Sequence, residues 1–118
     1  MREIIIERFL AFAVKIMSLE KVLCKSYTGR HIYGQLFRAG TSSGSNYNEA
    51  SAAESKKDFI HKMLISLKEL RESDYWLKLI SLSGLMPNDD PTLTFLLQEN
   101  KELLSIIGKA VATAKKNQ

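Results

Sequence analysis

A run of small and polar residues lies inside a segment whose apolar residues keep helical spacing. It covers residues 35–50 and contains the sequence QLFRAGTSSGSNYNEA. Gly, Ser and Thr are each less favourable than Ala inside a helix by roughly 0.3–1 kcal/mol. Gly40 and Gly44 are four residues apart, so they share one helix face on which a neighbouring backbone can approach. We therefore expect another helix to pack closely against this segment and hold it in register.

The composition is that of one globular domain. The chain has 118 residues, of which 45% are hydrophobic and 25% charged, so residues 1–118 are predicted to form a single domain. Uncharged apolar runs fall well short of the roughly 20 residues that span a bilayer, and no membrane partner is expected. Acidic residues interrupt the first apolar run and no cleavage site of small residues follows it, which predicts a cytoplasmic protein.

Residue types that bind metals are few and scattered. Cys24 is the only cysteine, which excludes an intramolecular disulfide, and we interpret it as a small buried residue near a helix end. His31 and His61 are isolated and are expected at the surface or at helix ends. No Glu is followed three residues later by His, as a di-iron bundle requires. We predict no metal and no other cofactor.

Four segments with helical spacing account for nearly the whole chain, and none alternates as a strand does. The first is expected to end at residues 27–29 and the second to run on to Ser55, which resembles the N-cap of the third. Gly84 is expected in the left-handed conformation after the third, and Asp90 followed by Pro91 starts the fourth. Short connections join antiparallel neighbours. The predicted fold class is therefore all-α, an antiparallel up-down-up-down four-helix bundle.

Three motifs between Gln35 and Ile80 have a recognisable combined pattern: QLFRAGTSSGSNYNEA, SKKDFIHKM and KELRESDYWLKLI. Together they resemble the four-helix-bundle family encoded by intervening sequences in bacterial 23S rRNA genes. The first and last helices agree with this family in length and apolar phase. Six positions are more polar than is usual in the family, namely Ser43, Ser45, Tyr47, Asn48, Ser66 and Ser73.

This resemblance implies a ring-shaped homopentamer. It also implies a scaffold or RNA-associated role, since a distant relative is the accessory protein that binds the reverse transcriptase and RNA of diversity-generating retroelements. The residues give a separate reason to expect a homo-oligomer. The first predicted helix carries two apolar rows and the third carries three, whereas a helix in an isolated bundle needs only a stripe a little over 100° wide.

Polar residues on the second and third helices form a candidate network. In two antiparallel helices, residues equally far in sequence from the connecting turn lie side by side, which places Arg38 beside Glu72. Glu69 is three residues before Glu72 and lies on the same helix face. Arg38 can then bridge both carboxylates and fix the register of the helices, because an unpaired buried charge is costly. The predicted network consists of Arg38, Asn46, Glu49, Glu69 and Glu72.

An enzymatic interpretation competes with this structural one. Helical bundles that hydrolyse nucleotides hold magnesium with Glu clusters on facing helices. Here Glu69, Glu72 and Asp74 lack a second paired set of carboxylates, and no nucleophile has an adjacent base. We predict no enzymatic activity and no small-molecule substrate. Tyr75 and Trp76 are interpreted as a packing anchor rather than a base-stacking platform.

Basic residues gather at one end of the predicted bundle. The start of the first helix, the turn after the second and the end of the fourth meet there, and in a ring this end becomes a repeated basic rim. Contacts of such a rim with phosphates are independent of sequence and sensitive to salt, so RNA or a nucleoprotein is the expected partner. The alternatives are a solvated bundle end and a purely structural protein–protein adaptor. The predicted nucleic-acid-binding residues are Lys56, Lys57, Lys109, Lys115 and Lys116.

Overall fold

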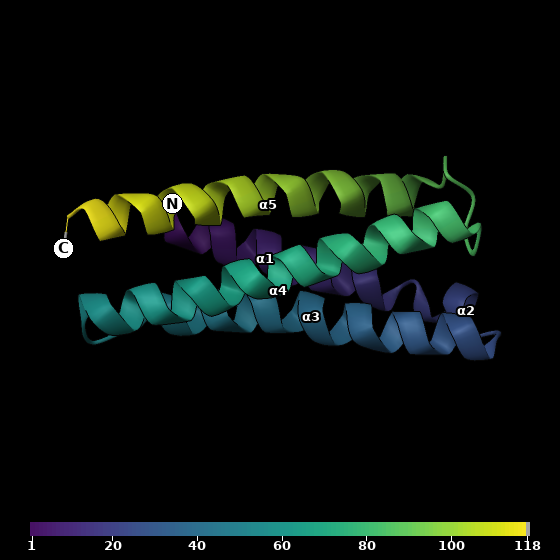
Figure 1. The fold of residues 1–118 in the computed structure, drawn as a ribbon, viewed down its shortest axis with the longest axis horizontal. Helices are drawn as coiled ribbons and strands as arrows, with labels where there is room; N and C mark the ends of the chain where they lie inside the picture. The colour runs from purple at the N-terminus through teal and green to yellow at the C-terminus, as the bar shows by residue number, and fades with distance from the viewer. Residues whose placement is uncertain (118) are drawn as a thin grey trace.

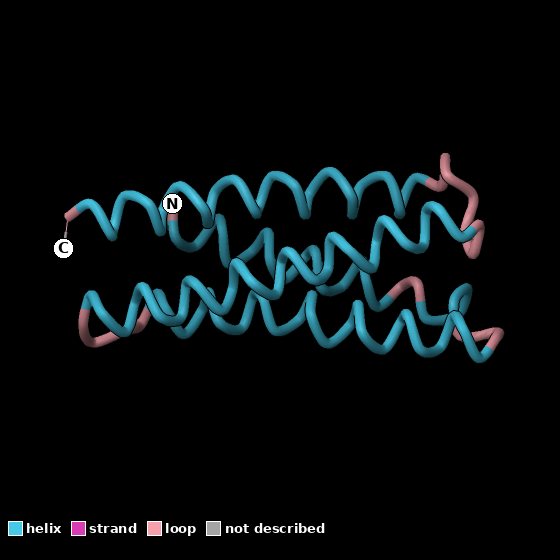
Figure 2. The backbone as a smooth tube through the Cα atoms, in the orientation of Figure 1, coloured by secondary structure: helices cyan, strands magenta, loops and turns pink. Residues whose placement is uncertain are grey.

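The computed structural model describes residues 1–117, which form five helices and no strand (Figure 1). The helices are α1 (Arg2–Met17), α2 (Glu20–Leu23), α3 (Tyr27–Ser51), α4 (Lys56–Ser83) and α5 (Pro91–Lys116). Helix α2 is a single turn. The four long helices run alternately up and down in a bundle of 46 × 21 × 21 Å, with the loops near its two ends (Figure 2). The predicted all-α antiparallel four-helix bundle is confirmed, and Gln118 lies outside the described residues.

The first half of the chain departs from the predicted helix boundaries. Helix α1 ends at Met17, where the Ser18 hydroxyl donates to the Lys15 carbonyl at 2.6 Å. Helix α3 already begins at Tyr27, because Ser26 caps it by accepting the Gly29 N–H at 3.0 Å. The prediction that residues 27–29 end the first helix is therefore wrong. A Cβ at Gly29 would lie 1.8 Å from the Leu23 carbonyl oxygen, so this glycine permits a close chain approach.

Helix α3 ends at Ser51, four residues before the predicted stop at Ser55. Three other helix ends match their sequence signals. Ser55 accepts the Asp58 N–H at 3.0 Å and caps α4, while Asp90 accepts the Leu93 N–H at 3.0 Å and caps α5. Gly84 ends α4 with φ of 77°, in the left-handed region. These three predictions are confirmed.

The core runs the length of the bundle. Each long helix contributes fully buried side chains to it, including Phe12, Leu36, Leu70 and Leu103. Burying a side chain of this size contributes about 1.5–3 kcal/mol. Helix α3 packs extensively on α4 and on α1, α4 packs on α5, and the contact between α1 and α5 is the smallest of the four.

The small residues of α3 face two neighbours. A Cβ added at Gly44 would lie 2.9 Å from the Phe9 Cβ, and one at Gly40 would lie 2.3 Å from the Ile16 Cδ1, so both glycines face α1. On the side toward α4, the Ser66 hydroxyl donates to the α3 carbonyl of Ser43 at 2.8 Å. The predicted close packing is confirmed, and it involves both flanking helices.

Candidate functional site

Arg38 of α3 joins two carboxylates of α4. Its Nη1 donates to Glu69 Oε2 at 2.8 Å and its Nη2 donates to Glu72. Trp76 Nε1 also donates to Glu72, at 3.3 Å. The Arg38 side chain is 51% exposed and that of Glu72 31%, whereas that of Glu69 is only 9% exposed. The hydrogen bond from Arg38 lowers the pKa of Glu72, so this carboxylate is held in its charged form.

The structure does not bring Asn46 and Glu49 into this network. Asn46 Nδ2 donates to the Ser42 carbonyl at 2.9 Å, within α3 itself, and Glu49 is exposed. These residues follow Arg38 by about 12 and 16 Å along the helix, at 1.5 Å per residue. Three of the five predicted members therefore lie together.

A buried polar contact between α4 and α5 was missed in the sequence. Asn100 and Ser73 are both completely buried; the Ser73 hydroxyl donates to Asn100 Oδ1, and Asn100 Nδ2 donates to the Leu70 carbonyl at 3.0 Å. Asn100 falls in the apolar row of α5 between Leu96 and Leu103, at helical spacing. A polar residue in such a row was the available signal for a contact that fixes helix register.

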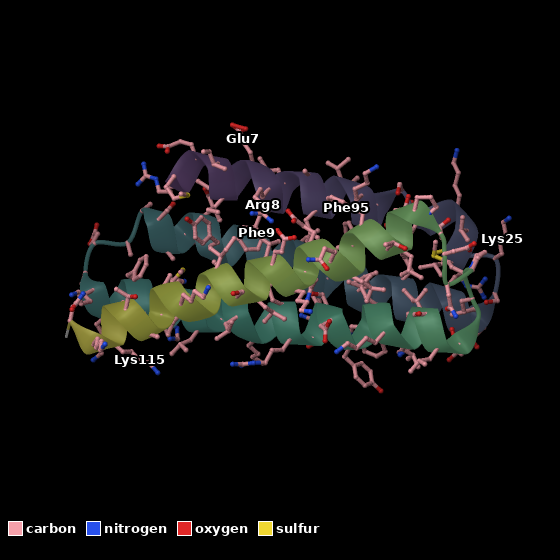
Figure 3. The ribbon with its side chains drawn as sticks, turned by 90° about the horizontal axis from the view of Figure 1, so that it is seen from above. Glu7, Arg8, Phe9, Lys25, Phe95 and Lys115 are labelled. Atoms are coloured by element: carbon pink, nitrogen blue, oxygen red, sulfur yellow. The ribbon has the colours of Figure 1, made fainter. Side chains whose placement is uncertain are left out.

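Arg8 links α1 to α5. It points from α1 toward α5, whereas the preceding Glu7 points away from the bundle (Figure 3). Arg8 makes two hydrogen bonds to Glu99, at 2.6 and 2.9 Å, and one to Glu102 at 2.8 Å. The Glu99 contact raises the pKa of the guanidinium. Both partners are acidic, so Arg8 adds no free cation to the nearby end of the bundle.

The five predicted nucleic-acid-binding lysines lie toward the end where the α3–α4 turn and the C-terminus meet (Figure 1). Lys56 Nζ donates to the Asn117 carbonyl at 3.0 Å, which brings the start of α4 to the end of α5. Lys109 lies about two turns before the end of α5 and lines a groove together with Arg2. All five are exposed, and none forms an ion pair with another residue of the described part of the chain. This set, Lys56, Lys57, Lys109, Lys115 and Lys116, is called the basic end below.

That groove was not foreseen from the sequence. It lies between the start of α1, the α3–α4 turn and the last turns of α5, and its volume is about 930 Å³. Most of its wall is apolar and includes Ile4, Ile5, Phe59, Met63 and Ile106.

The outer face of α1 carries exposed apolar side chains. Leu10, Val14 and Met17 are 62%, 63% and 53% exposed and follow one another by four and three residues. Beside this row, called the α1 row below, a hollow of about 450 Å³ is lined by residues of α1 and by Thr41, Gly44 and Ser45 of α3. An apolar ridge and a hollow thus lie side by side on one surface.

Residues 1–117 contain neither a metal-ligand cluster nor a membrane-spanning helix. No group of three His, Cys, Asp or Glu side chains is placed to hold a metal ion. No helix has the combination of length and apolar character that crossing a membrane requires.

Comparison with known proteins places the fold in a family. A solved structure of a protein with unknown function from the S23 ribosomal protein family of Bacteroides thetaiotaomicron is similar to this chain, with 31% sequence identity and a TM-score of 0.80. The similarity covers 90% of this chain and 96% of that one. No curated protein matches. The family model for the 23S rRNA-intervening sequence protein matches residues 2–109. The chain therefore belongs to the 23S rRNA-intervening sequence protein family.

Proposed function

We propose that this chain is a non-enzymatic assembly and interaction protein that forms a ring-shaped homo-oligomer, a homopentamer, and binds RNA or a nucleoprotein through the basic end. The observation that carries the RNA proposal is the unpaired state of the basic-end lysines within residues 1–117. Cations without an acidic partner retain their attraction for phosphates, and binding then releases counterions from the nucleic acid.

The α1 row supports assembly. Exposed apolar patches that extend along an element usually mark interfaces, and Leu10, Val14 and Met17 form such a patch. The adjacent hollow is bordered by Leu10 of this row and by Thr41 and Ser45 of α3, whose short side chains leave room for an apolar side chain of a neighbouring subunit. A contact between different surfaces of identical subunits is heterologous and closes into a ring when the rotation allows it. A ring repeats the basic end once per subunit.

A binding titration over a range of salt concentrations tests the RNA proposal. Fluorescence anisotropy of a labelled structured RNA should give a logarithm of the association constant that falls linearly with the logarithm of salt concentration. Replacing Lys56, Lys57, Lys115 and Lys116 together by Gln should weaken binding and flatten this dependence. A matched control replaces the exposed residues Lys15, Lys21, Lys25 and Arg30 by Gln. Absence of binding by the unchanged protein at low salt would refute the proposal.

The groove supports the second candidate, a purely structural protein–protein adaptor. Its wall is mainly apolar, and apolar walls suit side chains of a protein partner better than phosphates. An intact oligomer that binds no RNA at any salt concentration would favour this function.

The non-enzymatic part of the proposal has its own test. Incubation with a panel of nucleotides and magnesium should give no turnover. Turnover that Glu69→Gln and Glu72→Gln abolish would show that these carboxylates hold a catalytic metal.

A further inference from the structure

The outer face of α4 carries a row of exposed residues separated by three or four positions. Steps of this size keep residues on one side of a helix. The row contains no carboxylate. Leu64 lies on the same side of the helix, between His61 and Lys68. Its length from Lys57 to Lys78 is about 32 Å at 1.5 Å per residue. The row, called the α4 face below, includes Lys57, His61, Lys68, Arg71, Tyr75 and Lys78.

Most of the cations on the α4 face are free. Lys57, Lys68 and Arg71 form no ion pair within residues 1–117, while Lys78 is paired with Asp74 at 2.8 Å. Four carboxylates of α4 flank this face. Those of Glu69 and Glu72 are engaged by Arg38 of α3. That of Asp74 is the partner of Lys78, and that of Asp58 follows Lys57 directly in the chain. The charge that the α4 face presents to solvent is therefore positive along most of its length.

An exposed aromatic ring interrupts these cations. Tyr75 is 60% exposed, and it lies edge-on to Trp76, with ring centroids 5.1 Å apart and an interplanar angle of 84°. Trp76 is partly buried against the core and donates a hydrogen bond to Glu72, so the Trp76 ring is fixed in place. The interpretation of both residues as a packing anchor is therefore wrong for Tyr75, which is supported from one side and open to solvent. A supported, accessible ring among cations is the arrangement on which unpaired bases stack.

We propose that the α4 face binds a single-stranded segment of nucleic acid, with Lys68 and Arg71 contacting phosphates and Tyr75 stacking on a base. The inference rests on the proposed function and deepens it, because Lys57 belongs to both surfaces and lets one strand continue from the basic end along α4. A duplex does not fit, since its bases are already stacked on one another. A lipid surface does not fit either, since the apolar side of α4 is packed in the bundle core and is not free to insert into a membrane.

The test uses the full chain and fluorescein-labelled oligouridine of about 12 nucleotides, with the corresponding DNA strand in a parallel arm. Lys68→Gln combined with Arg71→Gln should weaken binding about tenfold or more at low salt and reduce the salt slope by about 1.4, which is two phosphate contacts on a single strand. The control, Lys21→Gln with Lys25→Gln, removes the same charge from α2 and the loop after it. Lys25 lies at the end of the bundle opposite Lys115 (Figure 3), and this control should behave as the unchanged protein does.

Tyr75 gives a second, independent readout. Tyr75→Ala should weaken binding roughly 5- to 150-fold without changing the salt slope, whereas Tyr75→Phe should retain binding because its ring is kept. Binding should also quench the fluorescence of Trp76, the chain's only tryptophan, which is in contact with Tyr75. Melting temperatures within about 2 °C of the unchanged protein show that these surface variants are folded.

The outcomes separate the two proposals. Loss of binding in the variant in which four of the five basic-end lysines are replaced, with full binding by the Lys68/Arg71 and Tyr75 variants, would overturn the α4 face and leave the proposed function standing. Failure of the unchanged protein to bind RNA or DNA at low salt would overturn both. Equal affinity for RNA and DNA assigns a general single-strand site, and tighter RNA binding assigns an RNA site. Binding to anionic vesicles without binding to either strand would overturn the nucleic-acid assignment.

Discussion

Gly44 of α3 lies so close to Phe9 of α1 that a Cβ added to the glycine would be 2.9 Å from the Cβ of the phenylalanine. Neither atom can rotate away, because each is attached directly to its backbone. This contact explains why a helix tolerates a run of poor helix formers at its centre. The missing side chains allow α1 to approach, and the resulting burial of Phe9 compensates for low helix propensity.

Gly44→Ala should therefore destabilise the protein. Ala gains up to about 1 kcal/mol in helix propensity, but overpacking against Phe9 should lower the free energy of unfolding by a net amount of about 1–3 kcal/mol. Gly34 is the matched control, because nothing lies within 4 Å of a Cβ built there. Gly34→Ala should raise the free energy of unfolding by about 0.5–1 kcal/mol. Urea denaturation of both variants measures the free energy of unfolding. Equal changes in this free energy for the two variants would contradict the close contact between Gly44 and Phe9.

Arg38→Ala should destabilise the protein in a pH-dependent way. The pKa of Glu72 is lowered chiefly by the hydrogen bond from Arg38, so the unfolded state binds more protons than the folded state as the solution is acidified. The contribution of the pair is therefore present above the unfolded pKa of Glu, about 4.3, and is lost as pH falls through the lower folded value. Because Arg38 is half-exposed and screened, we expect a loss of about 1 kcal/mol at neutral pH.

Urea unfolding at neutral pH and near pH 3 provides the measurement. The difference between Arg38→Ala and the unchanged protein should shrink at acid pH. A difference that persists there would indicate that the aliphatic part of Arg38 stabilises by packing, and that the charge pair does not.

Asn100 and Ser73 should be energetically coupled. Asn100→Ala removes a buried donor and leaves a small cavity, which should lower the free energy of unfolding by about 2 kcal/mol. In a double-mutant cycle with Ser73→Ala, the two losses should be non-additive by roughly 0.5 kcal/mol or more. Strict additivity would show that the hydrogen bond between their side chains contributes nothing to stability.

Val14→Lys should dissociate the oligomer while preserving the fold. Val14 is 63% exposed within one chain, so a charge there is tolerated by the subunit but is costly at an apolar interface. Size-exclusion chromatography with circular dichroism should show a smaller helical species. Ser105→Lys adds the same charge at an exposed position of α5 and should leave the size unchanged. Equal elution of the two variants would contradict the interface on α1.

The number of long helices, their apolar phase and three helix ends from Ser55 onward were predictable because their signals are local. Ser55, Gly84 and Asp90 act through bonds or backbone angles within a few residues. The break after Met17 was not predictable from apolar spacing, since Leu19 and Leu23 are buried and continue the spacing of α1. Gly29 resembled a helix stop, whereas its role is to let the Leu23 carbonyl approach from outside α3.

Polar contacts were predictable only where the helix turn fixes the level of both partners. Arg38 and Glu72 are at similar distances from the α3–α4 turn, and they meet. Asn46 instead donates a hydrogen bond within its own helix. Distance from the turn between two helices cannot predict such a contact. The α5 partner of Arg8, Glu99, depends on how α5 folds back beside α1, so its identity required the structure.

Multi-angle light scattering of the purified protein at micromolar concentration, alone and with a structured RNA at low salt, tests the central claim most directly. Assembly predicts a mass several times the 13.4 kDa of the chain, and five times that mass for the ring that the family resemblance implies. The mass should rise by that of the RNA at low salt and return to the protein value at high salt. A mass of 13.4 kDa with and without RNA would contradict both the assembly and the RNA binding proposed for this protein.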